Sequence, residues 1–312
     1  MNRDESPSRA ALEFLPGPIR GLISLVLLSL NTIVCCAAIF PLALVKLIVP
    51  TAGVRRRIDP LLHGIVEGWI AGNCLWIALM RNVKWEIEGV ERLRIDGWYL
   101  VEANHQSWAD VFVLQKVLSG RIPLVKFPLK RRLIWVPLAG LAWWALDYPF
   151  MSRYSEEFLR DHPDRRGEDL AAIRKSCEKF RLVPTSVGSF LEGTRFTQEK
   201  HAAQGSEYRH LLRPRAGGIA LALDAMGEQF EALLDVTIFY PHGAPTLFQF
   251  LSGKMERVVV LVRELPVPRE LIGGDYANDA ESRARVQEWV NGRWSEKDRT
   301  LEALRSEWSS RP

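Results

Sequence analysis

The sequence predicts an α/β fold, with a sheet covered by helices on its faces and a long apolar region before it. Residues 19–49 are almost wholly apolar, strand-like and helix-like patterns alternate from residue 81 onward, and residues 278–308 carry apolar side chains at helical spacing. These changes of pattern divide the chain into a polar lead at 1–18, a membrane-anchoring helical region at 19–80, an α/β domain at 81–265 and a C-terminal helical extension at 266–312.

Composition narrows the class of protein. The formal net charge is only +4, but basic side chains cluster at Arg55–Arg57 and at 126–132, patches that suit phosphate or anionic lipid better than a long nucleic acid. The 11 tryptophans fit either a chain that meets lipid headgroups or an ordinary buried core. The four cysteines and six histidines have no metal-ligand or disulfide spacing, so we expect no metal site.

The apolar run at 19–49 is too long for one simple membrane span. As a helix it would measure about 46 Å, against a hydrocarbon core of roughly 30 Å. Asn31-Thr32 and Pro41 offer places to bend, so a kinked span and a hairpin dipped into one leaflet both fit. Basic residues on both sides favour cytoplasmic ends and therefore the hairpin. A second apolar stretch at 64–80 fits an interfacial helix packed on the first, or a core helix.

Alternation and apolar periodicity locate the remaining elements. We expect strands at 83–89, 98–103, 122–126, 145–150, 185–191, 233–240 and 257–262. We expect a helix that begins near Ser107 and further helices at 170–180, 217–225 and 278–308. In open sheets of this kind, sites form where strands end.

A histidine and a carboxylate follow one of these strand ends. Asn104 and His105 come directly after the strand at 98–103, and Asp110 lies in the first turn of the next helix. A carboxylate bonded to one ring nitrogen would raise the basicity of the other, so that the imidazole could take a proton from an alcohol near neutral pH. The alternative is that His105 only caps or packs under the helix.

A second polar group follows the strand at 185–191. It reads Glu192-Gly193-Thr194-Arg195. Glycine lets the backbone turn tightly and brings its amides close to a ligand, while the arginine guanidinium suits a phosphate. Alone, this tetrapeptide carries little information about function.

Together, Asn104-His105-x4-Asp110 and Glu192-Gly193-Thr194-Arg195 resemble the glycerolipid acyltransferase family, in its lysophosphatidate (1-acylglycerol-3-phosphate O-acyltransferase) group. The resemblance extends to residues 126–130, 135–140 and 150–153 between the two motifs, and to residues 196–201, 212–218 and 235–241 after them. Thr237 stands where many members have proline. In this departure the chain resembles the lysocardiolipin and long-chain remodelling branch and its bacterial inner-membrane relative.

The resemblance implies a central mixed sheet flanked by helices, with an N-terminal membrane-embedded helical hairpin. It also implies transfer of an acyl group from acyl-CoA or acyl carrier protein, as co-substrate and without a further cofactor, to the sn-2 hydroxyl of lysophosphatidic acid or a related lysophospholipid. By the same resemblance His105 is the general base, Asp110 orients it, and Asn104 or nearby amides stabilise the oxyanion. The expected phosphate- and glycerol-binding residues are Glu192, Gly193, Thr194, Arg195, Lys126 and Arg153.

The expected partners are the two substrates, a bilayer and, as a further candidate, acyl carrier protein; no nucleic acid is expected. The expected location is the cytoplasmic face of a bacterial inner membrane.

Alternative functions are also open. The acceptor could be another lysophospholipid, such as lysophosphatidylglycerol or lysocardiolipin. A catalytically silent lipid-binding protein of this fold would lack His105, Asp110 or Glu192, and all three are present. A serine hydrolase would need Gly-x-Ser-x-Gly, to which only residues 187–190 come near.

Overall fold

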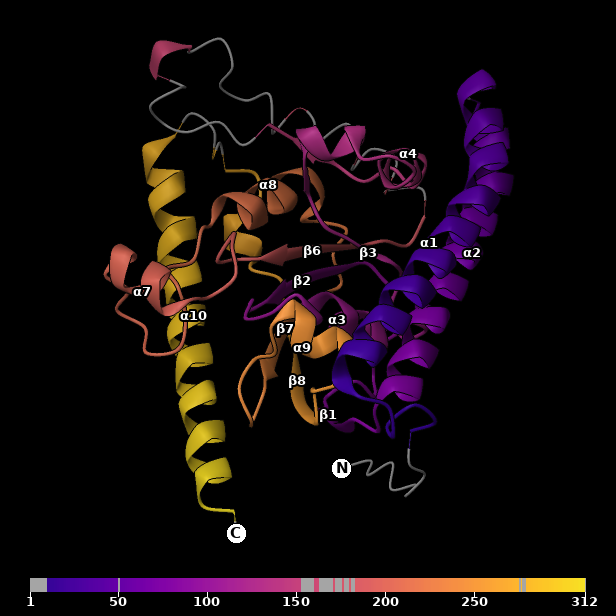
Figure 1. Ribbon diagram of the computed structural model, residues 1–312. Coiled ribbons are helices and arrows are strands. Elements are labelled where there is room, and N and C mark those ends of the chain that lie inside the picture. The colour runs from indigo at the N-terminus through magenta and orange to yellow at the C-terminus, as the bar shows by residue number, and fades with distance from the viewer. Residues whose placement is uncertain are drawn as a thin grey trace.

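A six-stranded mixed sheet forms the centre of the protein (Figure 1). The computed structural model describes residues 10–49, 51–152, 160–162, 171, 176, 180, 183–274, 276 and 279–311. The strand order is β1-β8-β7-β2-β6-β3, and all neighbours are parallel except the antiparallel pair β7 and β8. The strands are β1 Lys84–Glu88, β2 Tyr99–Ala103, β3 Val125–Lys126, β6 Ser186–Phe190, β7 Ala232–Phe239 and β8 Arg257–Leu265. The predicted mixed α/β sheet is therefore confirmed.

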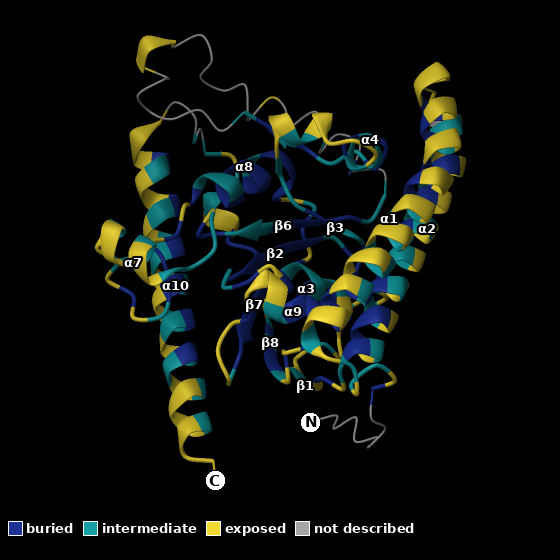
Figure 2. Ribbon diagram, in the orientation of Figure 1, coloured by how far each residue is buried: buried dark blue, intermediate teal, exposed yellow. Residues whose placement is uncertain are grey.

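Helices cover both faces of this sheet. On one face lie α8 (Gly217–Met226) and α10 (Ala280–Ser309), and on the other lie α3 (Ala109–Leu118), α9 (Leu247–Leu251) and the end of α2 (Ala52–Met80). Side chains alternate along each strand, so Leu100 packs towards α8 and α10 while Val101 packs towards α3. All residues of β2 and β7 are buried, which holds the strand ends in place (Figure 2).

The N-terminal hairpin is made by two whole helices. Helix α1 runs unbroken from Gly17 to Ile48 and packs along α2, so the hairpin is confirmed but its turn does not fall within 19–49 as expected. The polar side chains at the expected bend bind the partner helix instead. The Asn31 amide donates to the Trp69 carbonyl (2.9 Å) and to Asn73 Oδ1 (3.0 Å), while the Trp69 indole donates to Thr32 Oγ1 (3.2 Å). Pro41 lies inside the helix.

The predicted strand at 145–150 was also mostly wrong. Its first residue ends helix α4 (Ala139–Ala145), and only the short β5 (Phe150–Met151) follows, paired with β4 (Leu129–Lys130). Between them the chain turns, with φ of 59° at Asp147. The 3-10 helices η1 (Arg131–Trp135) and η3 (Arg269–Leu271) and helix α7 (Gln198–Gln204) complete the described elements. The helix predicted at 170–180 falls largely outside the described residues.

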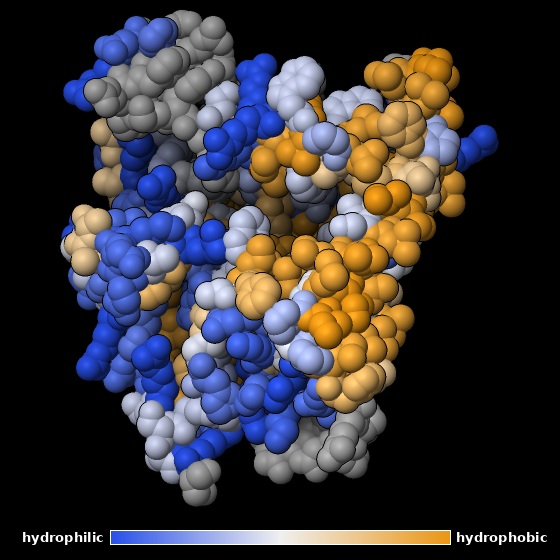
Figure 3. All heavy atoms as spheres, viewed as in Figure 1, coloured by the Kyte–Doolittle hydropathy of each residue, from blue (hydrophilic) through white to orange (hydrophobic). Residues whose placement is uncertain are grey.

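Helices α1 and α2 are both long and apolar enough to cross a membrane. The outer face of α1 is rich in exposed apolar side chains, among them Leu22, Leu25, Val26, Leu30, Ile33, Val34, Phe40, Leu44, Leu47 and Ile48. Figure 3 shows this surface as a continuous hydrophobic band, while hydrophilic side chains gather over α7 and α10. Exposed apolar area of this kind is typical of contact with lipid.

Candidate active site

Three neighbouring parallel strands end at the same edge of the sheet. Strand β2 pairs with β6 on one side and with β7 on the other, and Ala103 lies opposite Phe190. The residues that follow these strands therefore meet: His105 after β2, Glu192 after β6 and Tyr240 after β7. Carboxyl ends of parallel strands are where α/β proteins usually build their sites.

His105 and Asp110 form a direct pair. His105 Nδ1 lies 2.8 Å from Asp110 Oδ2, the Asp110 side chain is 0% exposed and the His105 side chain is 15% exposed. Because the carboxylate oxygen accepts, the proton belongs on Nδ1 and Nε2 is left as the acceptor. Among the described residues nothing hydrogen-bonds to Nε2. The His105 ring stacks on Phe190, with centroids 4.1 Å apart, which fixes its plane.

Asp110 is itself held by four donors. Besides His105, its Oδ2 accepts the backbone N–H groups of Gln106 (2.6 Å) and Ser107 (2.8 Å) at the start of α3. Its Oδ1 accepts the Tyr240 hydroxyl (2.6 Å) from the end of β7. A buried carboxylate held by this many donors cannot rotate, so it orients the imidazole rigidly.

Glu192 joins the two motifs. Its Oε1 accepts the His105 backbone N–H (2.7 Å) and its Oε2 accepts the Leu212 backbone N–H (3.0 Å). The His105 carbonyl in turn accepts the N–H of Phe196 (2.7 Å). Burial raises the pKa of Glu192 to about 8, although its bonds to the two backbone amides oppose the rise. With one oxygen on each of these two amides, the carboxyl clamps the histidine loop to the segment at Leu212.

The loop after Glu192 presents a guanidinium to the surface. Gly193 has φ of 66°, in the left-handed region that suits glycine. Lys200 donates to Thr194 Oγ1 (2.7 Å) and to the Arg195 carbonyl (2.9 Å), which braces the loop. The Arg195 guanidinium lies over the Trp108 ring, 4.5 Å from its centroid, and makes no hydrogen bond to any described residue. Both Arg195 and Trp108 line a cleft beside the histidine loop.

Asn104 holds two strands together. Its Nδ2 donates to the Ile238 carbonyl (2.9 Å), its Oδ1 accepts the Ile238 N–H (2.8 Å), and the residue is fully buried. Since both ends of the amide are occupied, the side chain extends the pairing of β2 with β7 just before His105. Its predicted role at an oxyanion stays a prediction that this geometry does not favour.

One further predicted phosphate ligand, Lys126, is not brought to Arg195. Lys126 lies opposite Val187, near the start of β6, whereas Arg195 follows the end of that strand. It is buried with its ammonium 4.3 Å from the Phe180 ring centroid, and it lines a separate small cavity with Asp59, His63 and Asp147. A phosphate role for Lys126 therefore finds no support in the geometry. Arg153 lies outside the described residues.

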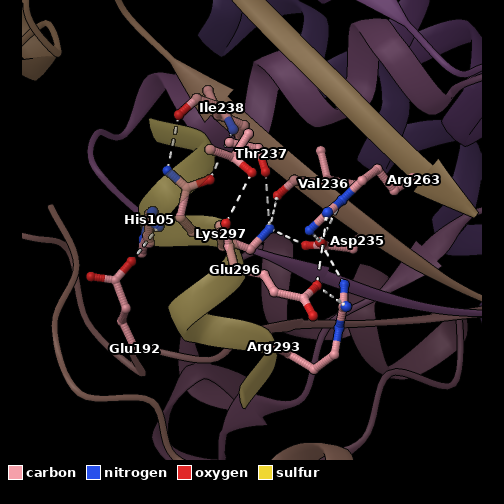
Figure 4. A network of polar contacts seen from close by, with 12 residues as sticks. His105, Glu192, Asp235, Val236, Thr237, Ile238, Arg263, Arg293, Glu296 and Lys297 are labelled. Atoms are coloured by element: carbon pink, nitrogen blue, oxygen red, sulfur yellow. Dashed lines mark hydrogen bonds and ion pairs between the residues drawn. The ribbon is translucent and has the colours of Figure 1, made fainter. Parts of the chain in front are cut away.

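A buried charge cluster ties the C-terminal helix to β7 (Figure 4). Lys297, on α10, is 0% exposed; its ammonium pairs with Asp235 and donates to the Val236 carbonyl (2.7 Å). Asp235 also accepts from Arg263 (2.5 Å) and Arg293 (2.9 Å). Burial opposes ionisation of Asp235, but Lys297 and Arg263 outweigh it and lower its pKa.

Glu102 completes this cluster from the neighbouring strand. It lies opposite Asp235 in the sheet and is fully buried, and its carboxyl oxygens have no hydrogen-bond partner among the described residues. Burial, and then the charge of Asp235, raise the pKa of Glu102. Glu102 therefore lies against the Asp235–Lys297 pair without a hydrogen bond to either group.

Several residues of the site were missed by sequence reasoning. Tyr240, Phe190 and Lys200 contact Asp110, His105 and the arginine loop, respectively. The tyrosine-proline turn after β7 was a usable signal for Tyr240, since that strand was expected to end there. Within the described ranges no three His, Cys, Asp or Glu side chains come together so that they could hold a metal ion.

Comparison with known proteins places this site in a family. The model of the acyltransferase family matches residues 84–242, just over half of the chain and the whole region from β1 to Tyr240. Human 1-acyl-sn-glycerol-3-phosphate acyltransferase delta is 30% identical over 213 residues, which is 64% of this chain and 51% of that protein. The Arabidopsis thaliana 1-acyl-sn-glycerol-3-phosphate acyltransferase 3 is 26% identical over 272 residues, 81% of this chain and 66% of that one.

This chain spans about half the length of the first of these relatives. Among solved structures, the 1-acyl-sn-glycerophosphate acyltransferase PlsC from Thermotoga maritima has a TM-score of 0.49 and 17% identity, over 95% of this chain and 99% of that one. The family match includes the histidine loop, the loop from Glu192 to Arg195 and the strand that leads to Tyr240. The chain therefore belongs to the acyltransferase family.

Proposed function

We propose that the protein transfers an acyl group from an acyl thioester, acyl-CoA or acyl carrier protein, to the sn-2 hydroxyl of lysophosphatidic acid or a related lysophospholipid. The observation that supports this most strongly is the buried Asp110–His105 pair, joined by Glu192 to a loop that presents the free guanidinium of Arg195. The names of the related proteins support the same acceptor.

The geometry supplies a base and its orienting carboxylate. His105 Nε2 takes the proton of the acceptor hydroxyl as the oxygen attacks the thioester carbonyl carbon. Asp110, held by its other donors, stabilises the imidazolium that forms. When the tetrahedral intermediate collapses, the carbon–sulfur bond breaks and the imidazolium returns the proton to the leaving thiolate. No enzyme nucleophile is needed, because the acceptor oxygen attacks directly.

Arg195 binds the acceptor phosphate in this proposal, and its removal tests the acceptor directly. Arg195→Ala is expected to raise the KM for lysophosphatidate roughly 10- to 100-fold, since a hydrogen bond to a charged group contributes about 1.5–3 kcal/mol. The control is Arg92→Ala, which removes an exposed arginine between β1 and β2. Steady-state kinetics are measured with lysophosphatidate and with monoacylglycerol, which lacks the phosphate. The comparison separates a loss of phosphate binding from a general loss of activity. An Arg195→Ala enzyme that still prefers lysophosphatidate as the wild type does would remove the phosphate role.

Tyr240 is expected to act through Asp110. Tyr240→Phe removes the hydroxyl that donates to Asp110 Oδ1, and we expect kcat to fall about tenfold, equivalent to about 1.4 kcal/mol of barrier. The matched control is Tyr148→Phe, whose hydroxyl donates to the Val125 carbonyl away from the dyad. Equal kcat values for Tyr240→Phe and Tyr148→Phe would show that the hydroxyl does not position the dyad.

The hairpin is proposed to lie in one leaflet, on the cytoplasmic face of a bacterial inner membrane. Ser24, near the start of α1, donates to the Leu251 carbonyl (2.7 Å), and Lys46, near its end, donates to the Ala145 carbonyl (2.7 Å). These two residues are about 33 Å apart along a helix, roughly the thickness of the hydrocarbon core. A perpendicular span would therefore draw the globular domain into the bilayer. If only the outer face of α1 is embedded, the globular domain stays in water. The site then lies at the membrane surface, where the lipid substrate is.

A further inference from the structure

A basic cleft of about 710 Å³ lies beside the histidine loop, between α7, α10 and the loop from β7 to α9. Its volume is in the range of small-molecule sites. The lining carries four permanent cations, Arg195, Lys200, Arg209 and Arg305, and no carboxylate among the described residues. A concave surface with this one-sided charge attracts anions and holds them away from bulk water.

The cations fall into two groups. Arg195 and Lys200 lie at the end beside Trp108, next to the histidine loop, where the proposed acceptor phosphate binds. Arg209 lies after α7 and Arg305 is on α10. Arg209 pairs with Glu302 (2.9 Å); within the described part of the chain Arg305 acts on the same carboxylate through its charge, without a hydrogen bond or ion pair. A single phosphate at Arg195 leaves Arg305 without a ligand, so the cleft has room and charge for a second anion.

Arg209 and Arg305, the second group of cations, face water and not lipid. Helix α10 stands on the opposite side of the sheet from the α1 and α2 hairpin (Figure 1), and the side chains around α7 and α10 are hydrophilic (Figure 3). Beyond Arg209 and Arg305 the cleft continues into a second hollow of about 430 Å³ that reaches Trp308. The Glu302 carboxylate lies in this second hollow, paired with Arg209 and His210. A ligand that enters here comes from the water and meets positive charge along an extended cleft.

We propose that the Arg305 end of this cleft binds the phosphorylated adenosine portion of coenzyme A, so that the acyl donor reaches His105 from the side of α10. This rests on the proposed function, and it selects acyl-CoA over acyl carrier protein as the donor. The diphosphate and the 3′-phosphate meet Arg305 and Arg209, and the pantetheine arm extends past Arg195 towards His105. Coenzyme A would bring three phosphates into the cleft and use the cations along its length, whereas a carrier protein would insert an arm with a single phosphate.

Adenosine 3′,5′-bisphosphate, which carries no acyl group, tests the site without catalysis. Binding to the full-length protein in bilayer nanodiscs is measured by calorimetry. The wild type is expected to bind it, Arg305→Glu to weaken binding at least tenfold, and Arg299→Glu to bind as the wild type does. Arg299 is the matched control because it is an exposed arginine on α10 outside the cleft. Unchanged binding in Arg305→Glu would overturn the proposal, as would no binding by the wild type.

Kinetics then separate this site from the acceptor site. In Arg305→Glu the KM for acyl-CoA is expected to rise at least tenfold, while the KM for lysophosphatidate and the rate with an acyl N-acetylcysteamine thioester, which has no phosphate, stay unchanged. A rise in the KM for lysophosphatidate alone, or weaker binding to anionic vesicles alone, would assign Arg305 to a lipid headgroup and contradict the proposal. A wild type that binds the bisphosphate but transfers no acyl group would refute the proposed function and leave the nucleotide site standing.

Discussion

Replacing His105 with alanine is expected to lower kcat for acyl transfer by a factor of about 10²–10⁴, the contribution typical of a positioned general base. The imidazole is the group in the site whose free ring nitrogen can accept the hydroxyl proton, and Asp110 cannot replace it because that carboxylate is 0% exposed and already held by four donors. The measurement is transfer of labelled acyl groups by the purified variant in bilayers of defined composition.

The loss must come from chemistry and not from unfolding or release from the membrane. His242→Ala is the control, because His242 is an exposed histidine that does not line the cleft beside the dyad. Both variants are expected to float with vesicles and to unfold at the same temperature as the wild type. A His105→Ala enzyme that keeps more than about a tenth of wild-type kcat would contradict the role of the dyad.

The second large effect is on stability. Lys297→Met is expected to lower the free energy of unfolding by about 3 kcal/mol or more, because it removes one partner of a fully buried ion pair. Asp235 keeps its two arginines, but its Oδ1 and the Val236 carbonyl lose their donor. Denaturant unfolding in detergent micelles, followed by tryptophan fluorescence, measures the change.

A double variant shows whether the pair itself is responsible. Asp235→Asn also takes the carboxylate from Arg263 and Arg293, so we expect the double variant to lose less stability than the sum of the losses in Lys297→Met and Asp235→Asn, which measures the coupling of the pair. Lys254→Met is the control for loss of a lysine, since Lys254 is exposed. If Lys297→Met and Lys254→Met unfold at the same denaturant concentration, the cluster does not anchor α10.

The parts of the site that depend on short stretches of chain could be predicted from the sequence. His105 and Asp110 are separated by less than two helical turns, so a strand followed by a helix was enough to place them together. The turn at Gly193 likewise follows from glycine at a strand end. The alternation of strands and helices predicted the α/β sheet, because it reflects which side chains each element buries.

Contacts between distant strands could not be predicted in this way. Tyr240 reaches Asp110 across 130 positions, and Lys297 reaches Val236 across 61, through pairings that depend on strand order and register. Lys126 was expected near Arg195 because basic residues suit phosphate, but the parallel register with β6 places it near the start of that strand. Charge predicts the kind of ligand that a residue can bind, while the sheet decides where the residue lies.

The contacts between the two helices of the hairpin could not be predicted from the sequence either. Apolar composition predicted contact with lipid, yet it could not show that Asn31 and Thr32 would bind Trp69 and Asn73 of a second helix and leave α1 unbroken. A polar pair in an apolar run fits a bend and an interhelical contact equally well, and only the partner helix distinguishes them.

The most direct test of the whole account is the product made by the purified wild-type protein in bilayers from labelled acyl-CoA and lysophosphatidate. We predict phosphatidate with the labelled chain at the sn-2 position, identified by mass spectrometry after positional cleavage, and loss of this product in His105→Ala. Release of labelled fatty acid without any diacyl product, from lysophosphatidate or from any other lysophospholipid, would contradict the assignment of this site to acyl transfer.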